Sequence, residues 1–580
     1  MRHLLRSLKA YRLPSFLAPL FKMLEAIFDL LVPVVVAKII NEGIGTPEAP
    51  GDAAKIWQYG LILAGMAVVG LAFAVTAQYF SAKAAIGCAA DLRSRLFRHI
   101  QTLGWGEADA LGTSTLITRM TSDINQVQSG VNMFLRLFLR SPFVVAGAFV
   151  CALLISPPIS LIFLGAIAAM AVIVVAIMRV TSPRYRANQQ RLDLVTRATR
   201  ENLTGLRVIR AFGMEERETE HFCGLNALLT RHQLAVGRIS ALMNPLTLVA
   251  VNAGVILVLK AGGDAVGSGS LLRGEIVALI NYMNQILVEL VKLANLVVTL
   301  SRGAASANRV AQVLDTAPAM TFPEEGAEPA ADAPAVVFDH VSLRYGGAGA
   351  ESLTDISFSC APGETVGVIG STGSGKSSLV HLIPRFYDAT SGEVRLFGHP
   401  VSAYARGTLR GLCGIVPQRA QLFTGTVRSN LLWGRADADD AALWDALESA
   451  QAADFVRQKP GQLGDPVEQA GRNLSGGQRQ RLTVARALVG RPPLLILDDS
   501  ASALDYATDA ALRKALRALP WKPTVFIVSQ RTASIRHADR ILVLDDGRLV
   551  SIGTHDELTR TCPVYREIHE SQYQKGDERA

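Results

Sequence analysis

A stretch of 20 residues without a charged side chain, ISLIFLGAIAAMAVIVVAIM (159–178), restricts the possible folds of this chain more than any other feature. A helix of this length and composition crosses the hydrocarbon core of a bilayer, which takes about 20 apolar residues. Similar stretches recur through the first ~300 residues of a chain that is 49% hydrophobic and only 19% charged. We therefore predict about six membrane spans, near residues 15–40, 57–85, 133–156, 158–180, 238–261 and 274–300.

Basic residues are concentrated in the segments that precede and connect these spans. Four of them, and no acidic residue, precede the first span: Arg2, Arg6, Lys9 and Arg12. The connections 86–132 and 181–237 are rich in arginine, whereas the first loop after residue 40 is mostly acidic. Because cytoplasmic segments carry an excess of Lys and Arg, we place the N-terminus and both connections in the cytoplasm. These arginines account for much of the net charge of +8, so nucleic-acid binding is disfavoured.

Two changes of composition divide the chain into a predicted transmembrane domain (1–314), a linker (315–335) and a second domain (336–580). The linker, DTAPAMTFPEEGAEPAADAPA, is rich in Pro, Ala and acids and lacks periodicity. After it, short β-rich runs alternate with helical ones, which predicts a mainly parallel α/β sheet. The long connections within the first domain repeat apolar residues every three or four positions, so we expect the spans to continue as cytoplasmic helices.

A phosphate-binding loop follows one of the predicted strands. GSTGSGKS (370–377) matches the pattern G-x-x-x-x-G-K-[ST] directly after the apolar run TVGVIG. Glycines at 370, 373 and 375 let backbone N–H groups face one centre, where a helix N-terminus adds its positive dipole. We expect Lys376 to reach the β- and γ-phosphates and the Ser377 hydroxyl to reach Mg²⁺.

Two further motifs extend this chemistry. LLILDD ends a predicted buried strand at Asp498, the position of a carboxylate that holds the Mg²⁺ shell. NLSGGQRQRLTVARAL (473–488) opens a helix at Ser475 and so forms a second anion-binding N-terminus. A phosphate already wrapped by the first loop leaves little space on that side. The second motif is therefore expected to cover a nucleotide held by another chain.

Together these motifs resemble those of ATP-binding cassette (ABC) transporters, and LSGGQ is among the most family-specific of short motifs. The resemblance covers essentially the whole chain and is closest to bacterial half-transporters of the exporter type. It implies a multi-domain membrane protein, with an all-α six-helix transmembrane domain (type I ABC exporter-like) followed by an α/β P-loop nucleotide-binding domain. It also implies ATP and Mg²⁺ as cofactors, a bacterial inner (cytoplasmic) membrane, and a cytoplasmic nucleotide-binding domain.

The resemblance assigns site residues by matching position. Tyr345 is expected to stack on adenine, Gln418 to lie near Mg²⁺ with Ser377 and Asp498. The remaining expected nucleotide contacts are Gly370, Ser371, Thr372, Gly373, Ser374, Gly375, Lys376 and Ser378.

Other matching positions are expected to act across a dimer or toward the membrane domain. The signature that covers the partner's ATP consists of Leu474, Ser475, Gly476, Gly477 and Gln478. Ser502 and Asp505 match the D-loop. The segments 113–123 and 201–212 match the two coupling-helix regions that carry motion between the domains.

The chain departs from the family pattern at two positions that serve hydrolysis. Asp499 stands where competent cassettes have Glu, and Gln530 stands where they have the switch-loop His. The shorter Asp withdraws the carboxylate by about an ångström, and Gln carries no titratable charge. Gln469 also replaces a Glu of many homodimeric relatives. The pattern resembles one subunit of heterodimeric ABC exporters, in which one composite site is impaired in hydrolysis and LSGGQ completes the partner's competent site.

Several functions remain open from the sequence. The leading hypothesis is export of small hydrophobic or amphipathic compounds, drug-like or lipid-like, with a second half-transporter subunit and within a lipid bilayer. The alternatives are a homodimeric exporter with a slow ATPase, a siderophore importer in an exporter-type fold, and a nucleotide-gated regulatory or channel subunit.

The last predicted span carries polar residues that are expensive in lipid. They lie at helical spacing and either line a substrate cavity or pair with other helices: Asn281, Gln285, Lys292 and Asn295. Lys22, Glu25 and Asp29 in the first span likewise either line a cavity or pair with other helices.

Overall fold

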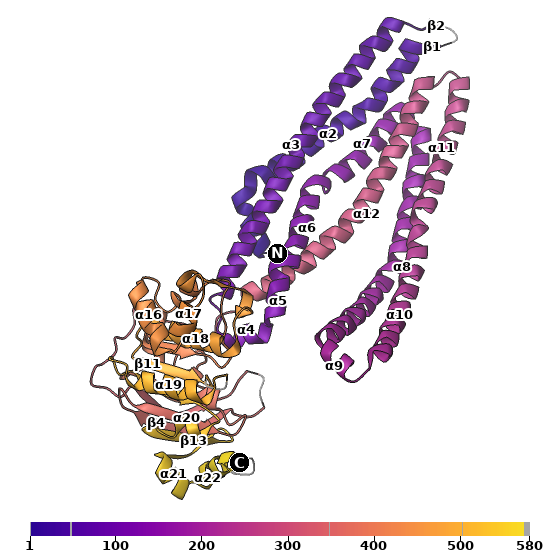
Figure 1. The fold of residues 1–580 in the computed structure, drawn as a ribbon. Helices are drawn as coiled ribbons and strands as arrows, with labels where there is room; N and C mark the ends of the chain where they lie inside the picture. Colours follow the sequence, from indigo (N-terminus) through magenta and orange to yellow (C-terminus); the bar gives the residue numbers. More distant parts are fainter. Residues whose placement is uncertain (1, 47–48, 347–348, 501–502, 574–580) are drawn as a thin grey trace. The chain divides into compact units, whose positions relative to one another are not determined.

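A computed structural model describes residues 2–46, 49–346, 349–500 and 503–573 (Figure 1). The chain forms two compact units. The helical unit comprises Met1–Gln101 and Ser114–Thr316, and the α/β unit comprises Thr102–Thr113 and Ala317–Ala580.

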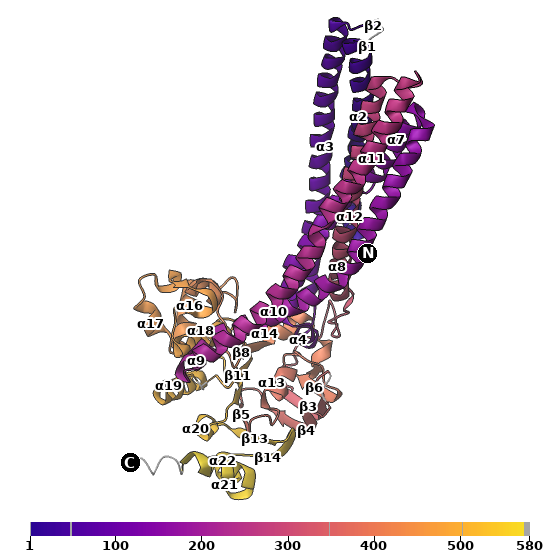
Figure 2. The same cartoon turned by 90° about the vertical axis from the view of Figure 1, so that its right-hand side faces the viewer.

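The helical unit consists of long helices that run along the long direction of the unit, with short helices at their ends (Figure 1, Figure 2). Its helices are α1 (Arg2–Leu8), η1 (Lys9–Tyr11), α2 (Arg12–Lys38), η2 (Ile39–Ile44), α3 (Ala53–Ile100), α5 (Thr113–Thr118), η3 (Arg119–Asp123), α6 (Ile124–Leu137), α7 (Arg140–Ile155), α8 (Pro157–Thr204), α9 (Leu206–Ala211), α10 (Glu215–Ala241), α11 (Met243–Gly267) and α12 (Arg273–Asp315). A small hairpin pairs β1 (Gly45–Thr46) with β2 (Ala49–Pro50). α3 and α8 have 48 residues each, about 70 Å, which is far longer than a bilayer core. They therefore continue beyond the membrane, as the sequence predicted.

Five helices in the described residues are long and apolar enough to cross a membrane: Ala53–Ile100, Thr113–Ile155, Pro157–Thr204, Glu215–Gly267 and Arg273–Asp315. The remaining predicted span, 15–40, coincides with α2, which has 27 residues. Lys22, Glu25 and Asp29 interrupt the apolar composition of α2.

α12 packs along α6, α7 and α2. A Cβ on Gly130 of α6 would lie 3.4 Å from the Gly303 Cα of α12, so two glycines let these helices cross closely. Phe163, Tyr282 and Met283 belong to the buried core of this unit.

The α/β unit is built on two sheets. The larger has the strand order β14 (Arg548–Gly553), β13 (Arg540–Asp545), β5 (Thr365–Gly370), β12 (Thr524–Val528), β11 (Leu494–Asp498) and β8 (Cys413–Val416). All its pairs are parallel except β13 with β14, which confirms the predicted mainly parallel sheet. The smaller sheet is antiparallel, in the order β4 (Leu353–Cys360), β3 (Val336–Leu343), β6 (Ser391–Leu396) and β7 (His399–Pro400).

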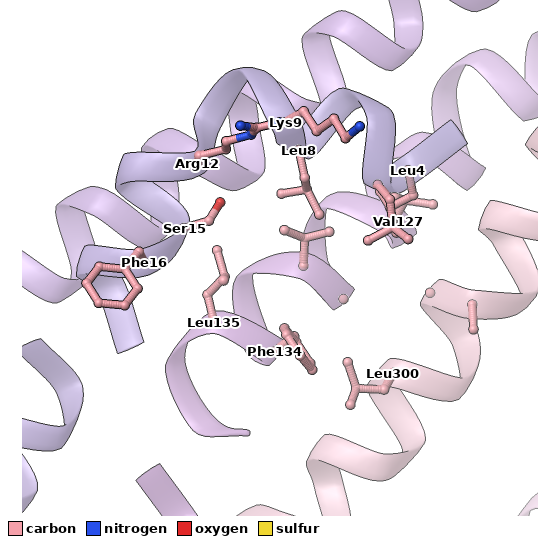
Figure 3. A pocket seen from close by; sticks show the side chains of 15 residues that line it. Leu4, Leu8, Lys9, Arg12, Ser15, Phe16, Val127, Phe134, Leu135 and Leu300 are labelled. Carbon is pink, nitrogen blue, oxygen red and sulfur yellow. The ribbon is translucent and has the colours of Figure 1, made fainter. Parts of the chain in front are cut away.

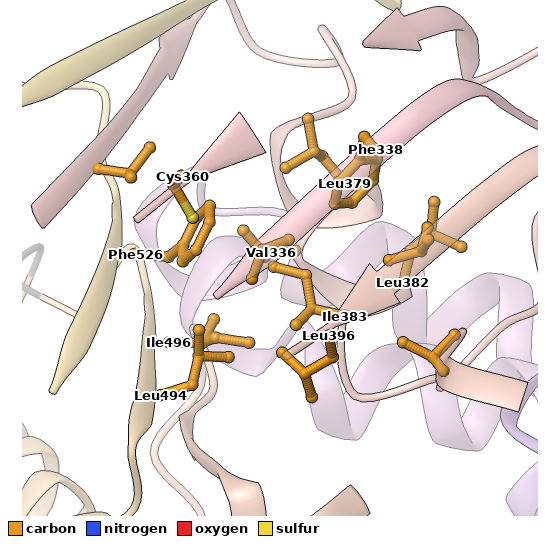
Figure 4. Packing of buried hydrophobic residues seen from close by; sticks show 14 of the residues in the cluster. Val336, Phe338, Cys360, Leu379, Leu382, Ile383, Leu396, Leu494, Ile496 and Phe526 are labelled. Atoms are coloured by element: carbon orange, nitrogen blue, oxygen red, sulfur yellow. The ribbon is translucent and has the colours of Figure 1, made fainter. Parts of the chain in front are cut away.

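Helices and short pairings complete this unit. They are α4 (Trp105–Leu111), α13 (Lys376–Leu382), η4 (Val401–Ala403), α14 (Arg406–Leu412), α15 (Val427–Leu431), α16 (Asp440–Ser449), α17 (Ala453–Arg457), η5 (Gln462–Gly464), η6 (Gln469–Gly471), α18 (Gly476–Val489), α19 (Tyr506–Arg517), α20 (Thr532–Ile535), α21 (His555–Thr561), α22 (Pro563–Tyr573), and the pair β9 (Gly425–Thr426) with β10 (Pro466–Val467). Figure 4 shows side chains from both sheets and from α13 meeting in one core, with Phe338, Leu379 and Phe526 buried. α13 is thereby fixed at the end of β5.

The domain boundaries differ from the sequence prediction in two places. Residues 317–335, predicted as a linker, belong to the α/β unit: the Phe322 ring lies under the guanidinium groups of Arg385 and Arg406, at 4.7 and 4.8 Å. Arg385 Nη1 also donates to the Thr321 carbonyl, at 2.9 Å. A Pro- and acid-rich composition does not reveal such contacts, because they come from residues distant in sequence.

α4, between α3 and α5, also belongs to the α/β unit. The Trp105 ring stacks on Phe386 with centroids 4.3 Å apart, and Glu107 Oε1 accepts from the Ala319 N–H at 2.9 Å. The first coupling segment was predicted at 113–123; the neighbouring residues 105–111 (α4) belong to the α/β unit. The second predicted segment, 201–212, contains the short α9, which joins α8 to α10 (Figure 1).

Candidate nucleotide-binding site

The predicted phosphate loop lies between β5 and α13 and has the backbone that its glycines allow. Gly373 and Gly375 adopt φ values of 86° and 93°, in the left-handed region. A Cβ on Gly375 would lie 2.7 Å from the Ser352 carbonyl oxygen, so no larger residue fits without a shift. The loop therefore curls tightly enough to present its N–H groups to a single centre.

Lys376 begins α13 and its side chain turns back over this loop. Nζ donates to the carbonyls of Gly370 and Ser371, at 2.9 and 2.6 Å. Burial lowers the pKa of Lys376. A buried ammonium that is held by neutral carbonyls can gain much from an anion, because the anion restores the solvation that burial removed.

Asp498 ends β11, the strand next to the edge strand β8, and lies beside the phosphate loop. Ser377 Oγ donates to Asp498 Oδ1 at 2.9 Å, which brings the two predicted metal ligands together. His381 Nε2 lies 3.6 Å from Asp498 Oδ2. Burial raises the pKa of Asp498 and lowers that of His381. Sequence reasoning missed His381, although its spacing of four from Ser377 places both on one helix face.

A cavity of about 460 Å³ collects most of the predicted nucleotide and hydrolysis residues. Parallel strands end at a common edge, so the segments after β5, β11 and β12 meet there. Its lining includes Thr372, Gly373, Gly375, Lys376, Ser377, Ser378, Gln418, Asp498, Asp499 and Gln530. Among the described residues, the signature residues Leu474, Ser475, Gly476, Gly477 and Gln478 are not part of this lining.

Asp499, directly after β11, takes a φ of 46°, in the left-handed region that Asp tolerates better than most residues. Its N–H donates to the Val528 carbonyl at 3.0 Å, which fixes its backbone against β12. Gln418 Nε2 donates to Asp499 Oδ2 over a long 3.5 Å. Burial raises the pKa of Asp499 above its ordinary value.

Gln530 follows β12, and the C-terminal helix α22 holds its loop. Gln572 Nε2 donates to the Gln530 carbonyl at 2.7 Å, and Gln572 Oε1 accepts from the Thr532 N–H at 2.9 Å. Sequence reasoning missed this contact, because a polar residue near the C-terminus carries no local signal for it.

Tyr345, predicted to stack on adenine, lies at the edge of the same region. Its hydroxyl donates to Ser378 Oγ at 2.9 Å, and its ring contacts Tyr387 edge-on with centroids 4.9 Å apart. Burial raises the pKa of Tyr345. The ring is thus fixed beside α13.

The signature opens α18 with a capping box. Ser475 Oγ accepts from the Gln478 N–H at 3.2 Å, and Gln478 Oε1 accepts from the Ser475 N–H at 3.0 Å. Asp505 caps α19 by accepting from the Thr508 N–H at 2.9 Å. The other predicted D-loop residue, Ser502, lies outside the described residues.

Two family models match the chain: the ABC transporter transmembrane region over residues 15–290 and the ABC transporter domain over residues 353–502. An uncharacterized ABC transporter ATP-binding protein of Bacillus subtilis (strain 168), YfiB, is 34% identical over 99% of both chains. The chain belongs to the ABC transporter family.

Other relatives of this ABC transporter extend the comparison. The uncharacterized ABC transporter ATP-binding protein Rv1273c of Mycobacterium tuberculosis (strain ATCC 25618 / H37Rv) is 35% identical over 97% of both chains. An ATP-dependent lipid A-core flippase of Hahella chejuensis (strain KCTC 2396) is 31% identical over 98% of this chain and 97% of its own. A bacterial Atm1-family ABC exporter with ATP bound superposes with a TM-score of 0.81 over 97% of this chain and 98% of its own, at 23% identity. The fold is therefore that of a type I ABC exporter, and the α/β unit is its ATP-binding domain.

The donor atoms near the phosphate loop suit Mg²⁺. Ser377 and Asp498 supply a hydroxyl and a carboxylate, and Gln418 supplies an amide, all in the cavity lining. Within the described ranges no group of three or more His, Cys, Asp or Glu could hold a metal ion by itself. Mg²⁺ usually takes one or two carboxylates from a protein and its other ligands from water and phosphate oxygens.

The polar residues of the last membrane helix belong partly to an ion-pair cluster. Arg140 of α7 lies 2.5 Å from Glu289 of α12 and 2.7 Å from Asp29 of α2. Lys292 lies 2.8 Å from Glu289, and Gln285 Nε2 donates to the Asp29 carbonyl at 2.9 Å. Of the four predicted cavity residues, Gln285 thus pairs between helices, whereas Lys292 pairs with Glu289 within α12. Asn281 is half-buried and Asn295 is exposed.

Proposed function

We propose that this transporter is one half of a heterodimeric exporter of small hydrophobic or amphipathic compounds. Its own phosphate loop and Asp498 bind ATP but hydrolyse it slowly, and its signature completes the partner's competent site. The observation that carries this proposal is that Asp499 and Gln530, which match the two hydrolysis positions of the family, line one cavity with Lys376.

The position of Asp499 supports slow hydrolysis. A general base must lie within hydrogen-bond reach of the water that it activates. The Asp499 backbone is fixed against β12 by its hydrogen bond to Val528. A shift of the backbone therefore cannot make up for the side chain being one methylene shorter than Glu. Burial raises its pKa, which makes the carboxylate a somewhat stronger base, yet a misplacement of about 1 Å can lower a rate by ~10²-fold.

Gln530 weakens the same step in a second way. Its amide can donate a hydrogen bond to a γ-phosphate, but it cannot carry the positive charge of a protonated His. Hydrolysis spreads negative charge over the phosphoryl oxygens, and electrostatic stabilisation of that charge supplies most of the catalysis. Loss of both groups therefore leaves binding largely intact and slows turnover.

ATP binding itself is supported by Lys376 and the tightly curled loop. Ser377, Asp498 and Gln418 would hold Mg²⁺ beside it, where the ion would neutralise charge on the β- and γ-phosphates. The capping box at Ser475 orders the α18 N-terminus, so its backbone N–H groups are ready to cover the γ-phosphate of the partner's nucleotide.

The class of compound is supported by the helical unit and by the relatives. The cluster of Lys22, Glu25, Asp29, Arg140, Glu289 and Lys292 contains three cations and three anions that pair with one another, so a strongly charged cargo finds little excess charge in it. Relatives named as lipid A-core flippases point to lipid-like amphiphiles. The arginine-rich connections support a bacterial cytoplasmic membrane with the ATP-binding domain inside.

The test is the variant Asp499→Glu/Gln530→His, co-purified with its partner half and reconstituted into liposomes. We expect its ATP turnover to rise, because a second competent site is added to the one already active. Gln469→Glu is the matched control, since it restores a family Glu at an exposed position outside the cavity. Unaltered turnover in the double variant, or an equal rise in the control, would contradict the proposal.

A further inference from the structure

A cavity of about 690 Å³ lies in the helical unit between the N-terminal helix and the helices α6 and α12 (Figure 3). Most of its lining is apolar or small, as shown by Leu4, Leu8, Val131, Phe134, Leu135 and Leu300. Its polar lining residues are Lys9, Arg12 and Ser15. The volume is in the range of sites that bind small ligands. Neither ATP chemistry nor the ion-pair cluster uses it.

The wall formed by α1 is held in place from its other side. Arg95 Nη1 of α3 donates to Ser7 Oγ at 3.0 Å, and His3 Nε2 lies 2.7 Å from Asp315 Oδ1 at the end of α12. These contacts fix the polar side of α1. Leu4 and Leu8 face the cavity. Because α1 is held by these contacts, its wall of the cavity has a fixed position.

The three polar residues form a track along one side of the cavity. Lys9 begins the 3-10 helix η1, and Arg12 and Ser15 lie in the first turn of α2; Figure 3 shows the three on the side of the cavity that these N-terminal helices form. Among the described residues, no acid pairs with Lys9 or Arg12, and the buried Ser15 Oγ has no hydrogen-bond partner. A buried hydroxyl without a partner is costly, so a ligand acceptor at this position is favoured.

We propose that this cavity binds an anionic phospholipid of the cytoplasmic leaflet. One acyl chain lies against the apolar wall, and the phosphate accepts hydrogen bonds from Lys9, Arg12 and Ser15. The basic N-terminus places this track at the cytoplasmic interface, where basic pockets between membrane helices bind anionic headgroups. A soluble anion would leave the apolar wall unused, and a neutral apolar compound would leave two cations and a hydroxyl unmatched.

Leu5 and Phe16 line the same cavity and are 60% and 67% exposed. Exposed apolar side chains of this size suit contact with lipid, so they provide an entrance from the surrounding bilayer. The cavity also contacts α12 at Leu300 and Ala304. A bound lipid would therefore pack directly on the helix that leads toward residue 315.

The experiment measures lipid retained by the full-length purified transporter, using native mass spectrometry after exchange with equal amounts of phosphatidylglycerol and phosphatidylcholine. We expect the wild type to retain phosphatidylglycerol on the order of tenfold over phosphatidylcholine. Lys9→Ala/Arg12→Ala should abolish this preference. Arg2→Ala/Arg6→Ala removes the same charge from the same segment but outside the cavity lining, and should keep the preference.

Two further variants test the apolar part. Ala304→Phe should lower retention of both lipids, because it fills the cavity, whereas Ala305→Phe on the exposed side of α12 should not. Ser15→Leu is the second filling variant if Ala304→Phe does not fold. The proposal is overturned by equal retention of the two lipids in the wild type, by equal effects of the two double variants, or by filling variants that retain lipid like the wild type.

Discussion

The two units of this transporter bury charged side chains in opposite ways. In the helical unit the charges satisfy one another: Arg140 contacts two acids, and Ser141 also donates to Glu289 at 2.7 Å. In the ATP-binding domain two adjacent acids and one lysine share a cavity, and burial opposes the charge of all three. The pKa values of Asp498 and Asp499 are raised, and that of Lys376 is lowered.

The charges of the helical cluster therefore hold helices together, whereas the charges of the nucleotide cavity are available to bind a ligand. Removing one member of a closed ion-pair cluster leaves its partners buried and unpaired. Removing a member of the nucleotide cavity relieves an unfavourable burial and sacrifices binding instead. We therefore expect substitutions in the ion-pair cluster to lower the stability of the fold and substitutions in the nucleotide cavity to lower ATP binding.

The largest effect is expected from Arg140→Met. It leaves Glu289, which is 3% exposed, and Asp29 without their shared cation, so the free energy of unfolding should fall by about 3–5 kcal/mol. Thermal unfolding of the purified protein in detergent measures this loss. The double variant Arg140→Met/Glu289→Met should recover part of it. A single variant as stable as the wild type would show that the cluster does not hold the helices together.

A smaller effect, on binding rather than folding, is expected from Lys376→Met. ATP affinity should fall by about 2–3 kcal/mol, because a charge-assisted contact to the phosphates is lost. The unfolding temperature without nucleotide should not fall, since burial already disfavours this ammonium. Equilibrium binding of labelled ATP and thermal unfolding measure the two effects.

The matched control for that variant is Lys459→Met, which removes an ion pair at 2.6 Å from Asp465 outside the cavity. It should leave ATP affinity unchanged and slightly lower stability. The contrast between structural and functional charges would be wrong if Lys459→Met lowered ATP affinity and Lys376→Met lowered only stability.

The smallest effect concerns two histidines of the ATP-binding domain away from the cavity. Burial lowers the pKa of His555 below its ordinary value of 6.5. The unfolded chain then binds more protons than the folded one, so stability is lost as the pH falls below about 6.5. His555→Gln should flatten this loss in unfolding scans from pH 8 to pH 5.5.

The stability contribution of His340 has the opposite pH dependence to that of His555. Its hydrogen bond with Asp355 raises its pKa, so its contribution is present below pH 6.5 and disappears as the pH rises. His340→Gln should therefore lose a little stability only at the acidic end of the same scan. Identical pH profiles for the two variants would contradict the assigned shifts.

Local patterns predicted much of this molecule. The phosphate loop, the strand that ends at Asp498 and the signature helix are each defined by residues close in sequence, and the structure places Lys376, Ser377, Asp498, Asp499 and Gln530 in one cavity. Alternating strands and helices likewise predicted the parallel sheet, because each element carries its own periodicity.

Contacts between distant residues could not be predicted in the same way. Arg140 and Glu289 are 149 positions apart, and α4 packs on Phe386 from a segment that reads as a membrane-domain connection. The polar face of the last membrane helix showed that its residues need partners but did not identify them. The packed course of residues 317–335 and the contact of Gln572 with the Gln530 loop belong to the same class.

The most direct test of the central claim follows ATP occupancy and phosphate release in parallel on the purified chain, assembled without its partner in liposomes. The account predicts that ATP binds stoichiometrically and stays largely intact, with turnover appearing only after the competent half is added. Rapid phosphate release by this chain alone, abolished by Asp499→Asn, would contradict it.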